Sequence, residues 1–415
     1  MSASAVAPPR FFYGWIVVSA AFAVLFVGFG TAYSFAAFFH PLRDEFDATR
    51  GDISLVFALT GFLYFILGAV SGPLADRIGP QRVILAGVAL IALGLFLASA
   101  AQHLWQVYLT YSLGVGIGVG LAYVPAVGAV QRWFSRNRGL ASGLAVSGIG
   151  AGTLALPLLA TAGINSLGWR ETYLALGAMA LVLGVPAAMF VEHSPERRGL
   201  RADGDAPVAG VPGIAAGGLS IKSAVRSRPF LLLYLASLST GIGLFIPFAH
   251  LAPYARDHGF SDGFGAFLVG MIGVGSTAGR LGLGGSADRI GRKTSLVGTF
   301  IAMGISLVGW LGATEAWSLI LFALVFGAAY GGFVALVPAL AADYFGGRNM
   351  GGILGILYTA AGVGALFGPV LAGAVYDARE SYTLPILLAV MTNCCAVVCI
   401  WLLPHPKRWS DQHRS

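Results

Sequence analysis

Arg280 is a charged residue inside a long apolar stretch, GAFLVGMIGVGSTAGRLGLGGSADRIGRK. If this stretch is a helix that crosses a membrane and Asp288 marks its end, Arg280 lies about 12 Å inside the apolar core, at roughly 1.5 Å per residue. A charge at that depth costs about 2.5–3.5 kcal/mol on insertion scales. We therefore expect Arg280 to face a cavity and bind an anion. The alternative is a structural arginine held by backbone carbonyls or by a carboxylate, but Asp and Glu lie only at the ends of the apolar stretches.

The other candidate site residues are hydroxyl-bearing or aromatic side chains that we expect to line the same cavity. Ser276 precedes Arg280 by one helical turn, and Tyr330 has glycines beside it in the sequence GAAYGGF. Their hydroxyls could donate hydrogen bonds to a carboxylate, whereas the alternative is packing between helices with a satisfied hydroxyl. The complete candidate set for substrate binding is Arg280, Tyr330, Ser276, Tyr123, Tyr33 and Phe333, the last as a cavity wall beside an apolar part of the ligand.

His250 lies near the end of another apolar segment, about 30 Å from the start of that segment at the same helical rise. Histidine titrates near neutral pH. A role in proton coupling or in an outer gate is therefore one interpretation. The other is an interfacial histidine with a structural hydrogen bond.

The composition indicates a membrane protein with many spans. Of the 415 residues, 57% are hydrophobic and only 10% are charged, whereas soluble domains carry about 25% charged residues. The net charge of +7 is explained by basic loops on one side of a membrane, so we expect no nucleic-acid partner. The sequence has no Walker motif, no paired nucleophile and base, and no His/Cys metal spacing. We expect no enzyme activity, no cofactor and no bound metal.

Twelve apolar segments of helical length predict an all-α polytopic protein, because lipid offers no partner to an open backbone. The predicted spans are 13–39, 53–75, 83–101, 105–131, 138–163, 170–191, 229–253, 264–286, 294–313, 317–341, 350–376 and 382–404. With the N-terminus in the cytoplasm, nineteen of the 25 Lys and Arg residues lie on the cytoplasmic side and five in the outer loops, as the positive-inside rule requires. We expect a multi-pass protein of the cell (inner) membrane with both termini cytoplasmic.

The chain is predicted to divide into two pseudo-symmetric six-helix bundles joined by a polar cytoplasmic linker. The predicted parts are the N-terminal bundle 1–192, the linker 193–228, the C-terminal bundle 229–404 and a cytoplasmic tail 405–415. The halves repeat, because GPLADRIG at 72–79 matches GGSADRIG at 284–291 at an offset of 212. Gly150, Gly152 and Pro157 recur at the same offset as Gly362, Gly364 and Pro369. Such parallel repeats are typical of two-bundle transporters.

The repeated loop is a candidate conformational gate. Its candidate residues are Gly72, Asp76, Arg77, Gly79, Asp288, Arg289, Gly291 and Arg292. Asp76 and Asp288 could cap a helix N-terminus and pair with arginines in one conformation only. The alternative is that the arginines simply follow the positive-inside topology.

Together these features resemble the major facilitator superfamily over nearly the whole chain. The loop GPLADRIGPQR and its repeat GSADRIGRK are similar to the signature of that superfamily. The resemblance implies two bundles that rock around a midplane site, and a loop that locks their cytoplasmic ends.

Within the superfamily, the chain resembles the monocarboxylate porter and oxalate/formate carrier group. Phe12-Tyr-Gly-Trp15, the run from Trp133 to Gly148 and the position of Arg280 carry this resemblance, which implies that Arg280 binds the substrate. Ser276 stands where eukaryotic members of the group have an aspartate, and neither the first nor the eleventh span contains a lysine. These departures disfavour the proton relay of that group and a dicarboxylate substrate.

The leading hypothesis is a secondary active transporter of small monocarboxylates resembling lactate or pyruvate, coupled to protons and functional as a monomer in the bilayer. Arg280 would bind the carboxylate, and the proton would reside on His250 or on the substrate itself. One alternative is an exchanger or exporter of a larger or aromatic organic anion. A more remote alternative is a non-transporting membrane sensor, which the short C-terminal tail disfavours.

Overall fold

The computed structural model describes residues 12–134, 138–204, 219–346 and 350–406. These residues contain twelve spans long and apolar enough to cross a membrane, which confirms the predicted all-α fold. The spans are α1 (Gly14–Phe46), α2 (Arg50–Ile78), α3 (Pro80–Ser99), α4 (Leu104–Val107) with α5 (Leu113–Trp133), α6 (Arg138–Leu167), α7 (Trp169–Met179) with α8 (Val185–Phe190), α10 (Arg228–Leu244) with α11 (Ile246–Asp257), α12 (Asp262–Ile290), α13 (Arg292–Leu311), α14 (Ala316–Phe345), α15 (Met350–Arg379) and α16 (Thr383–Trp401).

Several helices continue beyond their predicted ends. The first was predicted to end at residue 39 but α1 ends at Phe46, and α6, α11, α12 and α14 each end four residues later than predicted. The apolar pattern ends with the bilayer core, whereas the helical hydrogen bonds continue to the next backbone conformation that stops them. After α1 that residue is Asp47 (φ 47°), and after α12 it is Gly291 (φ 99°). Both lie in the region of positive φ that favours glycine or a short polar residue.

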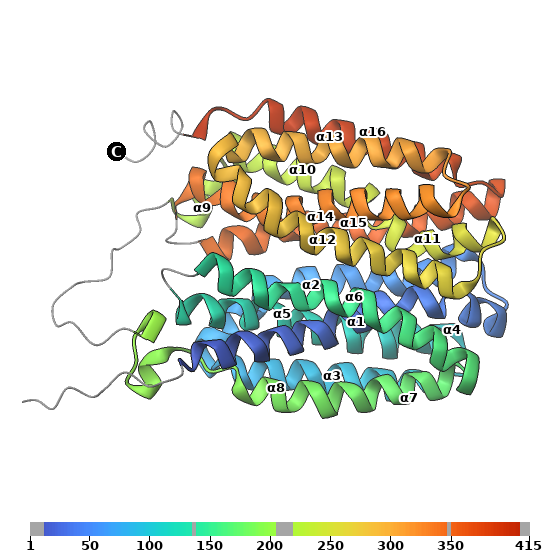
Figure 1. The fold of residues 1–415 in the computed structure, drawn as a ribbon, viewed down its shortest axis with the longest axis horizontal. Coiled ribbons are helices and arrows are strands. Elements are labelled where there is room, and N and C mark those ends of the chain that lie inside the picture. The colour runs from blue at the N-terminus through green and yellow to red at the C-terminus, as the bar shows by residue number, and fades with distance from the viewer. Residues whose placement is uncertain (1–11, 135–137, 205–218, 347–349, 407–415) are drawn as a thin grey trace, which may run out of the picture.

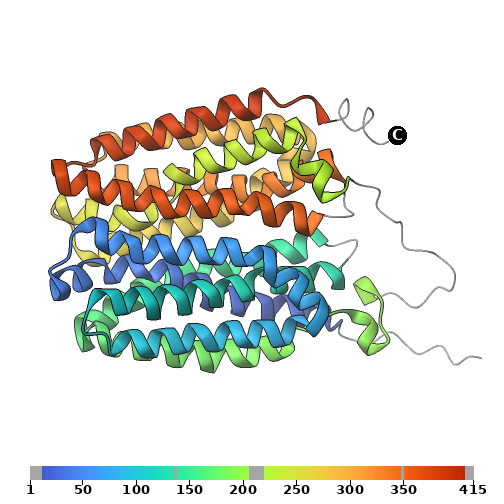
Figure 2. The ribbon, with the colours of Figure 1, turned by 180° about the vertical axis from the view of Figure 1, so that it is seen from behind.

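The two halves of the molecule lie side by side, with their helices running in roughly the same direction (Figures 1 and 2). Helices α2, α3, α4–α5 and α6 begin and end 212 residues before α12, α13, α14 and α15, respectively. The internal repeat deduced from two short motifs therefore extends over four of the six spans in each half. Across the contact between the halves, α2 packs against α15, α6 against α12, and α1 against α11.

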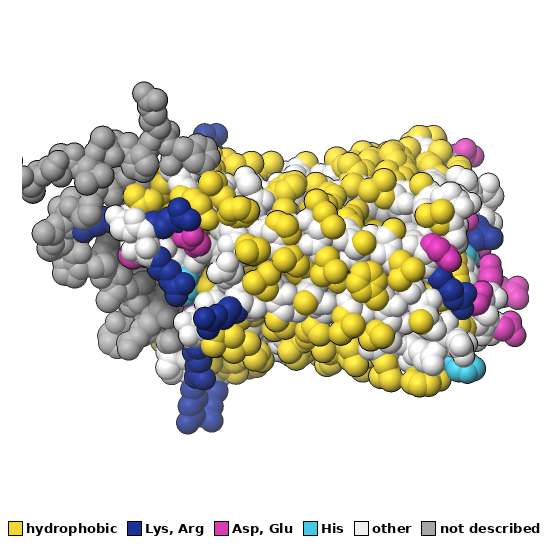
Figure 3. All heavy atoms as spheres, turned by 90° about the horizontal axis from the view of Figure 1, so that it is seen from below, with side chains coloured by type: hydrophobic (Ala, Val, Ile, Leu, Met, Phe, Trp, Pro, Cys, Tyr) yellow, Lys and Arg dark blue, Asp and Glu magenta, His cyan; other side chains and the backbone are white. Residues whose placement is uncertain are grey.

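The two ends of the molecule are named here by their segments. The linker end carries the short helix α9 (Ile221–Val225) and residues 193–204, and the far end carries the turns at 47–49 and 258–261. On the face drawn in Figure 3, charged side chains gather at these two ends and leave an apolar belt between them. This distribution is the one that a bilayer imposes on the surface of a polytopic protein.

Two local features of the C-terminal half shape the central site. The seventh span is interrupted between α10 and α11 at Phe245, because Pro247 near the start of α11 lacks an N–H and its ring collides with an ideal preceding turn. Helices α12 and α14 approach closely at four glycines, Gly275 and Gly279 on α12 and Gly327 and Gly331 on α14. A Cβ on Gly331 would collide with the carbonyl oxygen of Ser276, and a Cβ on Gly279 with that of Ala328. These contacts hold Tyr330 and Arg280 beside each other.

We therefore expect Gly331→Ala to destabilise the protein by about 1–3 kcal/mol, the usual cost of overpacking a well-packed interior. The colliding atom belongs to the backbone, so it cannot move aside by a change of rotamer. The matched control is Gly298→Ala on α13, where an added Cβ meets no atom of the described residues within 4 Å. This control should be neutral or stabilising by about 0.5–1 kcal/mol, because glycine is a poor helix former. Thermal unfolding of the purified variants measures both effects, and equal midpoints would contradict the prediction.

Candidate functional site

A cavity lies between the two halves near the middle of the spans. Its empty space, counted together with the solvent at its opening, is about 660 Å³. Its lining is mostly apolar and aromatic, and Arg280 is the only charged side chain among the described residues that line it. The lining residues are Phe29, Phe65, Tyr123, Ile149, Ser237, Gly241, Leu244, Phe245, Arg280, Tyr330, Phe333, Val334, Val337, Pro338, Leu357, Tyr358 and Ala361.

The cavity extends from the middle of the spans toward the linker end. On α14 the lining continues from Tyr330 to Pro338, which lies closer to that end. On the other side of the cavity, toward the far end, the halves are joined by aromatic contacts. The hydroxyls of Tyr33 on α1 and Tyr330 on α14 are 3.3 Å apart, and the Tyr33 ring stacks on Phe248 with centroids 4.5 Å apart. These contacts separate the cavity from the far end.

Arg280 lies between the halves and retains hydrogen-bonding capacity. Its Nη1 donates to the carbonyl oxygen of Val146 on α6 over 3.3 Å, and its buried Nε–H has no hydrogen-bond partner among the described residues. The guanidinium carbon lies 5.8 Å from the centroid of the Tyr330 ring. Within the described part of the chain, no ion pair of Arg280 with a carboxylate is found. A buried cation with an unused donor is suited to binding an anion from solution.

Three tyrosine hydroxyls accompany this cation. Tyr123 on α5 and Tyr358 on α15 interact with each other and with the charge of Arg280, and Tyr330 is the third. Each pair of tyrosines, Tyr123 with Tyr358 and Tyr33 with Tyr330, connects the N-terminal half to the C-terminal half. An anion bound at Arg280 would therefore meet phenol donors from both halves.

The structure places the predicted substrate residues in two groups. Arg280, Tyr330, Tyr123 and Phe333 line the cavity together. Ser276 and Tyr33 are not among the described lining residues, and each is nearly fully buried. Ser276 packs against α14 at Gly331. Tyr33 packs against Tyr330 and Phe248. The prediction for Ser276 used helical spacing alone, and spacing does not show that α14 covers this side of α12.

The repeated loops at the linker end join helices within each half rather than the halves to each other. Gly79 (φ 92°) and Gly291 (φ 99°) provide the sharp breaks between helices that glycine makes possible. The prediction that Asp76 caps a helix N-terminus is wrong, because Asp76 lies in the last turn of α2 and pairs with Arg132 of α5. The last turn of a helix presents carbonyl oxygens, which do not attract a carboxylate.

The remaining loop candidates have the following positions. Arg292 pairs with Asp343 of α14, in the same half, over 2.6 Å. Arg77 and Arg289 are exposed, Gly72 faces Val124 of α5, and the side chain of Asp288 lies outside the described residues.

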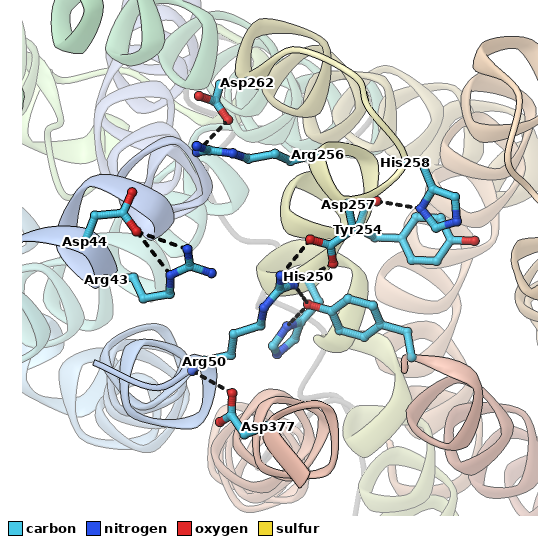
Figure 4. Close-up of polar contacts among 11 residues, drawn as sticks. Arg43, Asp44, Arg50, His250, Tyr254, Arg256, Asp257, His258, Asp262 and Asp377 are labelled. Atoms are coloured by element: carbon cyan, nitrogen blue, oxygen red, sulfur yellow. Dashed lines mark hydrogen bonds and ion pairs between the residues drawn. The ribbon is translucent and has the colours of Figure 1, made fainter. Parts of the chain in front are cut away.

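At the far end, a buried ion pair connects the halves (Figure 4). Arg50, in the first turn of α2, is 6% exposed. It donates two hydrogen bonds to Asp257 at the end of α11, over 2.8 and 2.6 Å, and a third to the hydroxyl of Tyr382 over 2.6 Å. Its guanidinium also lies 3.8 Å from the centroid of the Tyr376 ring. A fork of this kind fixes both partners in direction as well as distance.

His250 and Asp377 extend the same network. Asp377 on α15 accepts hydrogen bonds from the backbone N–H groups of Arg50 and Gly51, over 3.0 and 2.8 Å. His250 on α11 is fully buried and contacts the hydroxyls of Ser54 and Tyr382 and the carbonyl oxygen of Pro369. We call the set Arg50, Ser54, His250, Asp257, Asp377 and Tyr382 the far-end lock.

The charge count placed Arg50 among the five basic residues of the outer loops. Arg50 is instead the first residue of α2, and its side chain is buried between the halves. A signal was present in the sequence: Thr49 and Asp52 form a capping box, a pattern that marks the start of a helix. The pairing of Arg50 with Asp257, 207 residues away, has no such local signal.

Comparisons with known proteins agree with this architecture. Residues 20–311 and 274–415 match the model of the Major Facilitator Superfamily. A solved bacterial homolog of the human lysosomal transporter Spinster, in an inward-facing and unoccupied conformation, superposes with a TM-score of 0.72. That match covers 95% of this chain and 98% of the other at 14% identity, which shows a common fold.

Curated relatives are similar over almost the whole chain. Human monocarboxylate transporter 11 is 31% identical over 398 residues, which cover 94% of this chain and 82% of the relative. Bovine monocarboxylate transporter 13 is 28% identical, with coverage of 96% and 91%. The MFS-type transporter pynF of Aspergillus niger is 28% identical, with coverage of 88% and 82%.

Proposed function

Because the chain belongs to the Major Facilitator Superfamily, we propose that it is a secondary active transporter of small monocarboxylates such as lactate or pyruvate. The two halves would rock around the central cavity and expose it to each side of the membrane in turn. The similarity to monocarboxylate transporters 11 and 13 supports this substrate class. It also favours transport over a sensor function.

The observation that carries the proposal is Arg280 in the cavity. Of the lining residues that the structure describes, it is the one with a charge, and none of the others is acidic. A single carboxylate would neutralise it and could form two parallel hydrogen bonds with its guanidinium. The loaded site then loses most of the penalty for a charge in an apolar surrounding. This change would favour closure of the bundles around the substrate.

The rest of the lining supports a substrate with an apolar part. Seven of the lining residues are aromatic, and Ser237 is the one polar side chain besides Arg280 and the tyrosines. Such a lining would accommodate the methyl group of lactate, and it equally favours a larger or aromatic carboxylate. An exchanger or exporter of such an anion is therefore the second candidate function.

The distribution of charge supports a proposal for orientation and location. We propose that the linker end is cytoplasmic, because nineteen of the 25 basic residues belong to the segments assigned to that side. The protein would then lie in the cell (inner) membrane, with both termini in the cytoplasm, and act as a monomer. In the described part of the chain, the lining has no carboxylate that could hold a coupled proton. The remaining candidates for the coupled proton are His250 and the substrate carboxylate.

The function is tested by counterflow in proteoliposomes loaded with unlabelled lactate. We expect rapid uptake of labelled lactate, competition by pyruvate and little competition by oxalate, because the site offers one cation. A pH gradient alone should drive accumulation. If only a gradient of a counter-anion drives it, the carrier is an exchanger. If aromatic acids compete and lactate does not, the second candidate replaces the first.

A further inference from the structure

The hydrogen bonds of the far-end lock fix the protonation state of His250. The carbonyl oxygen of Pro369 can only accept, and it lies 2.8 Å from Nε2, so Nε2 carries a proton. Ser54 donates its hydroxyl proton to the carbonyl oxygen of Arg50 and therefore accepts from the same Nε2–H at 3.0 Å. The other ring nitrogen, Nδ1, decides the charge of the imidazole.

Nδ1 lies 3.1 Å from the hydroxyl of Tyr382. This hydroxyl already accepts a hydrogen bond from Arg50 over 2.6 Å, so its own proton is free to be donated, and Nδ1 is the acceptor beside it. The closed lock thus holds a neutral imidazole with one proton, on Nε2. A proton on Nδ1 would place two cationic donors against one phenol oxygen and leave the phenol proton without this acceptor.

The charged groups around His250 do not offer the cation a partner of its own. On α11, Asp257 is engaged by both terminal nitrogens of Arg50, and on α15 Asp377 is engaged by two backbone N–H groups. On α1, Phe39 lies edge-on against His250, and its neighbours His40 and Arg43 present no carboxylate to the imidazole. Arg256 pairs with Asp262 at the surface. A cation at His250 would therefore be buried next to Arg50 without an anion in contact.

We propose that His250 is a proton-binding site that opens the far end of the transporter. Protonation of Nδ1 breaks the bond from Tyr382 and repels Arg50. Separation of α2 from α11 and α15 then admits water. The water forms hydrogen bonds with the groups that lost their partners and weakens the repulsion between His250 and Arg50. Closure of the lock returns that proton to the side from which it came. His250 thus sets the balance between conformations, and of the two candidates for the coupled proton this leaves the substrate carboxylate. This inference rests on the proposed alternating access, since it assigns a trigger to one of its two gates.

The test measures the distance across the far end with spin labels on the full chain in lipid nanodiscs. The labelling sites are Gln102→Cys and Thr314→Cys. Both positions are exposed, and they lie on opposite halves at equivalent places in the repeat, 212 residues apart. The native cysteines Cys394, Cys395 and Cys399 are replaced by serine so that only these two sites are labelled. When the pH is lowered from about 8 to about 5, we expect the fraction of molecules with a longer distance between the labels to increase. This range brackets the ordinary histidine pKa of about 6.5. The open-to-closed ratio can rise by at most about tenfold per pH unit for one proton.

His250→Gln should abolish this response and keep the short distance, because its amide offers a donor and an acceptor but takes up no proton. The matched controls His40→Gln and His258→Gln, at the same end but outside the lock, should retain it. Tyr382→Phe leaves His250 in place and should move the midpoint of opening to higher pH. An unchanged response in His250→Gln, an unchanged midpoint in Tyr382→Phe, or no response in the parent would overturn the proposal. Lactate counterflow is measured separately. Its absence would contradict lactate as the substrate but would leave the proposal about far-end opening untouched.

Discussion

Replacement of Arg280 by alanine is expected to reduce lactate counterflow by roughly 30-fold to several thousand-fold. Removal of one partner from a buried, hydrogen-bonded charge pair costs about 2–5 kcal/mol, and each 1.4 kcal/mol is about tenfold. Among the described lining residues there is no second cation that could take over, so the substrate carboxylate would be buried among aromatic rings without a counter-charge. Initial rates of labelled lactate exchange in proteoliposomes measure the effect.

Arg280→Lys separates charge from geometry. Lysine keeps the positive charge but loses the planar fork, so we expect binding to weaken strongly even though the site stays cationic. The control is Arg226→Ala, an exposed arginine that follows α9 in the linker, which should transport like the parent. Near-normal exchange by Arg280→Ala would exclude Arg280 as the substrate site. Equal rates for Arg280→Lys and the parent would show that charge alone is sufficient.

The fold could be predicted because its signals are local or repeated. Each span has a long apolar run, and the offset of 212 found between two loops recurs in the bounds of four pairs of helices. Arg280 could be singled out for a similar reason, since a charge in an apolar run is conspicuous without any knowledge of its neighbours. Tyr330, Tyr123 and Phe333 also line the cavity, as expected for residues near the middle of cavity-lining spans.

The sequence could not predict which face of each helix points toward the cavity, or which helix packs over that face. Ser276 is one turn from Arg280, but the close approach of α14 at Gly331 buries it outside the cavity. Tyr358 lines the cavity and was not among the candidates, because one helix offers several faces and spacing does not select among them. Arg50 shows a third limit, since a charge next to a predicted turn is assigned to solvent unless its distant partner is known.

The second large effect concerns that distant partner. We expect Asp257→Asn to open the far end, because Arg50 stays buried while it loses both bonds to a carboxylate. Breaking a buried ion pair costs about 3–5 kcal/mol. We expect the lower end of this range, since the Asp257 side chain is 26% exposed and water can replace part of the interaction. A shift of about 3 kcal/mol changes the open-to-closed ratio by about a hundredfold, which the far-end distance between labelled Gln102→Cys and Thr314→Cys would report at neutral pH.

A neighbouring ion pair supplies the control for this effect. Arg256 and Asp262 lie 3.4 Å apart at the same end, with side chains 43% and 48% exposed, and exposed pairs contribute about 0–1 kcal/mol. Asp262→Asn should therefore leave the far-end distance nearly unchanged. The double variant Arg50→Met/Asp257→Asn should open less than Asp257→Asn alone, because it no longer leaves a buried charge without its partner. If Asp257→Asn shifts the distance no more than Asp262→Asn, the far end is closed by apolar packing such as that of Tyr33 on Phe248, and the ion pair contributes little to closure.

If the prediction holds, the far end of the pathway is closed by polar contacts, and the substrate is bound by a cation in the middle of the molecule. Each of these two features can then be altered while the other is left intact.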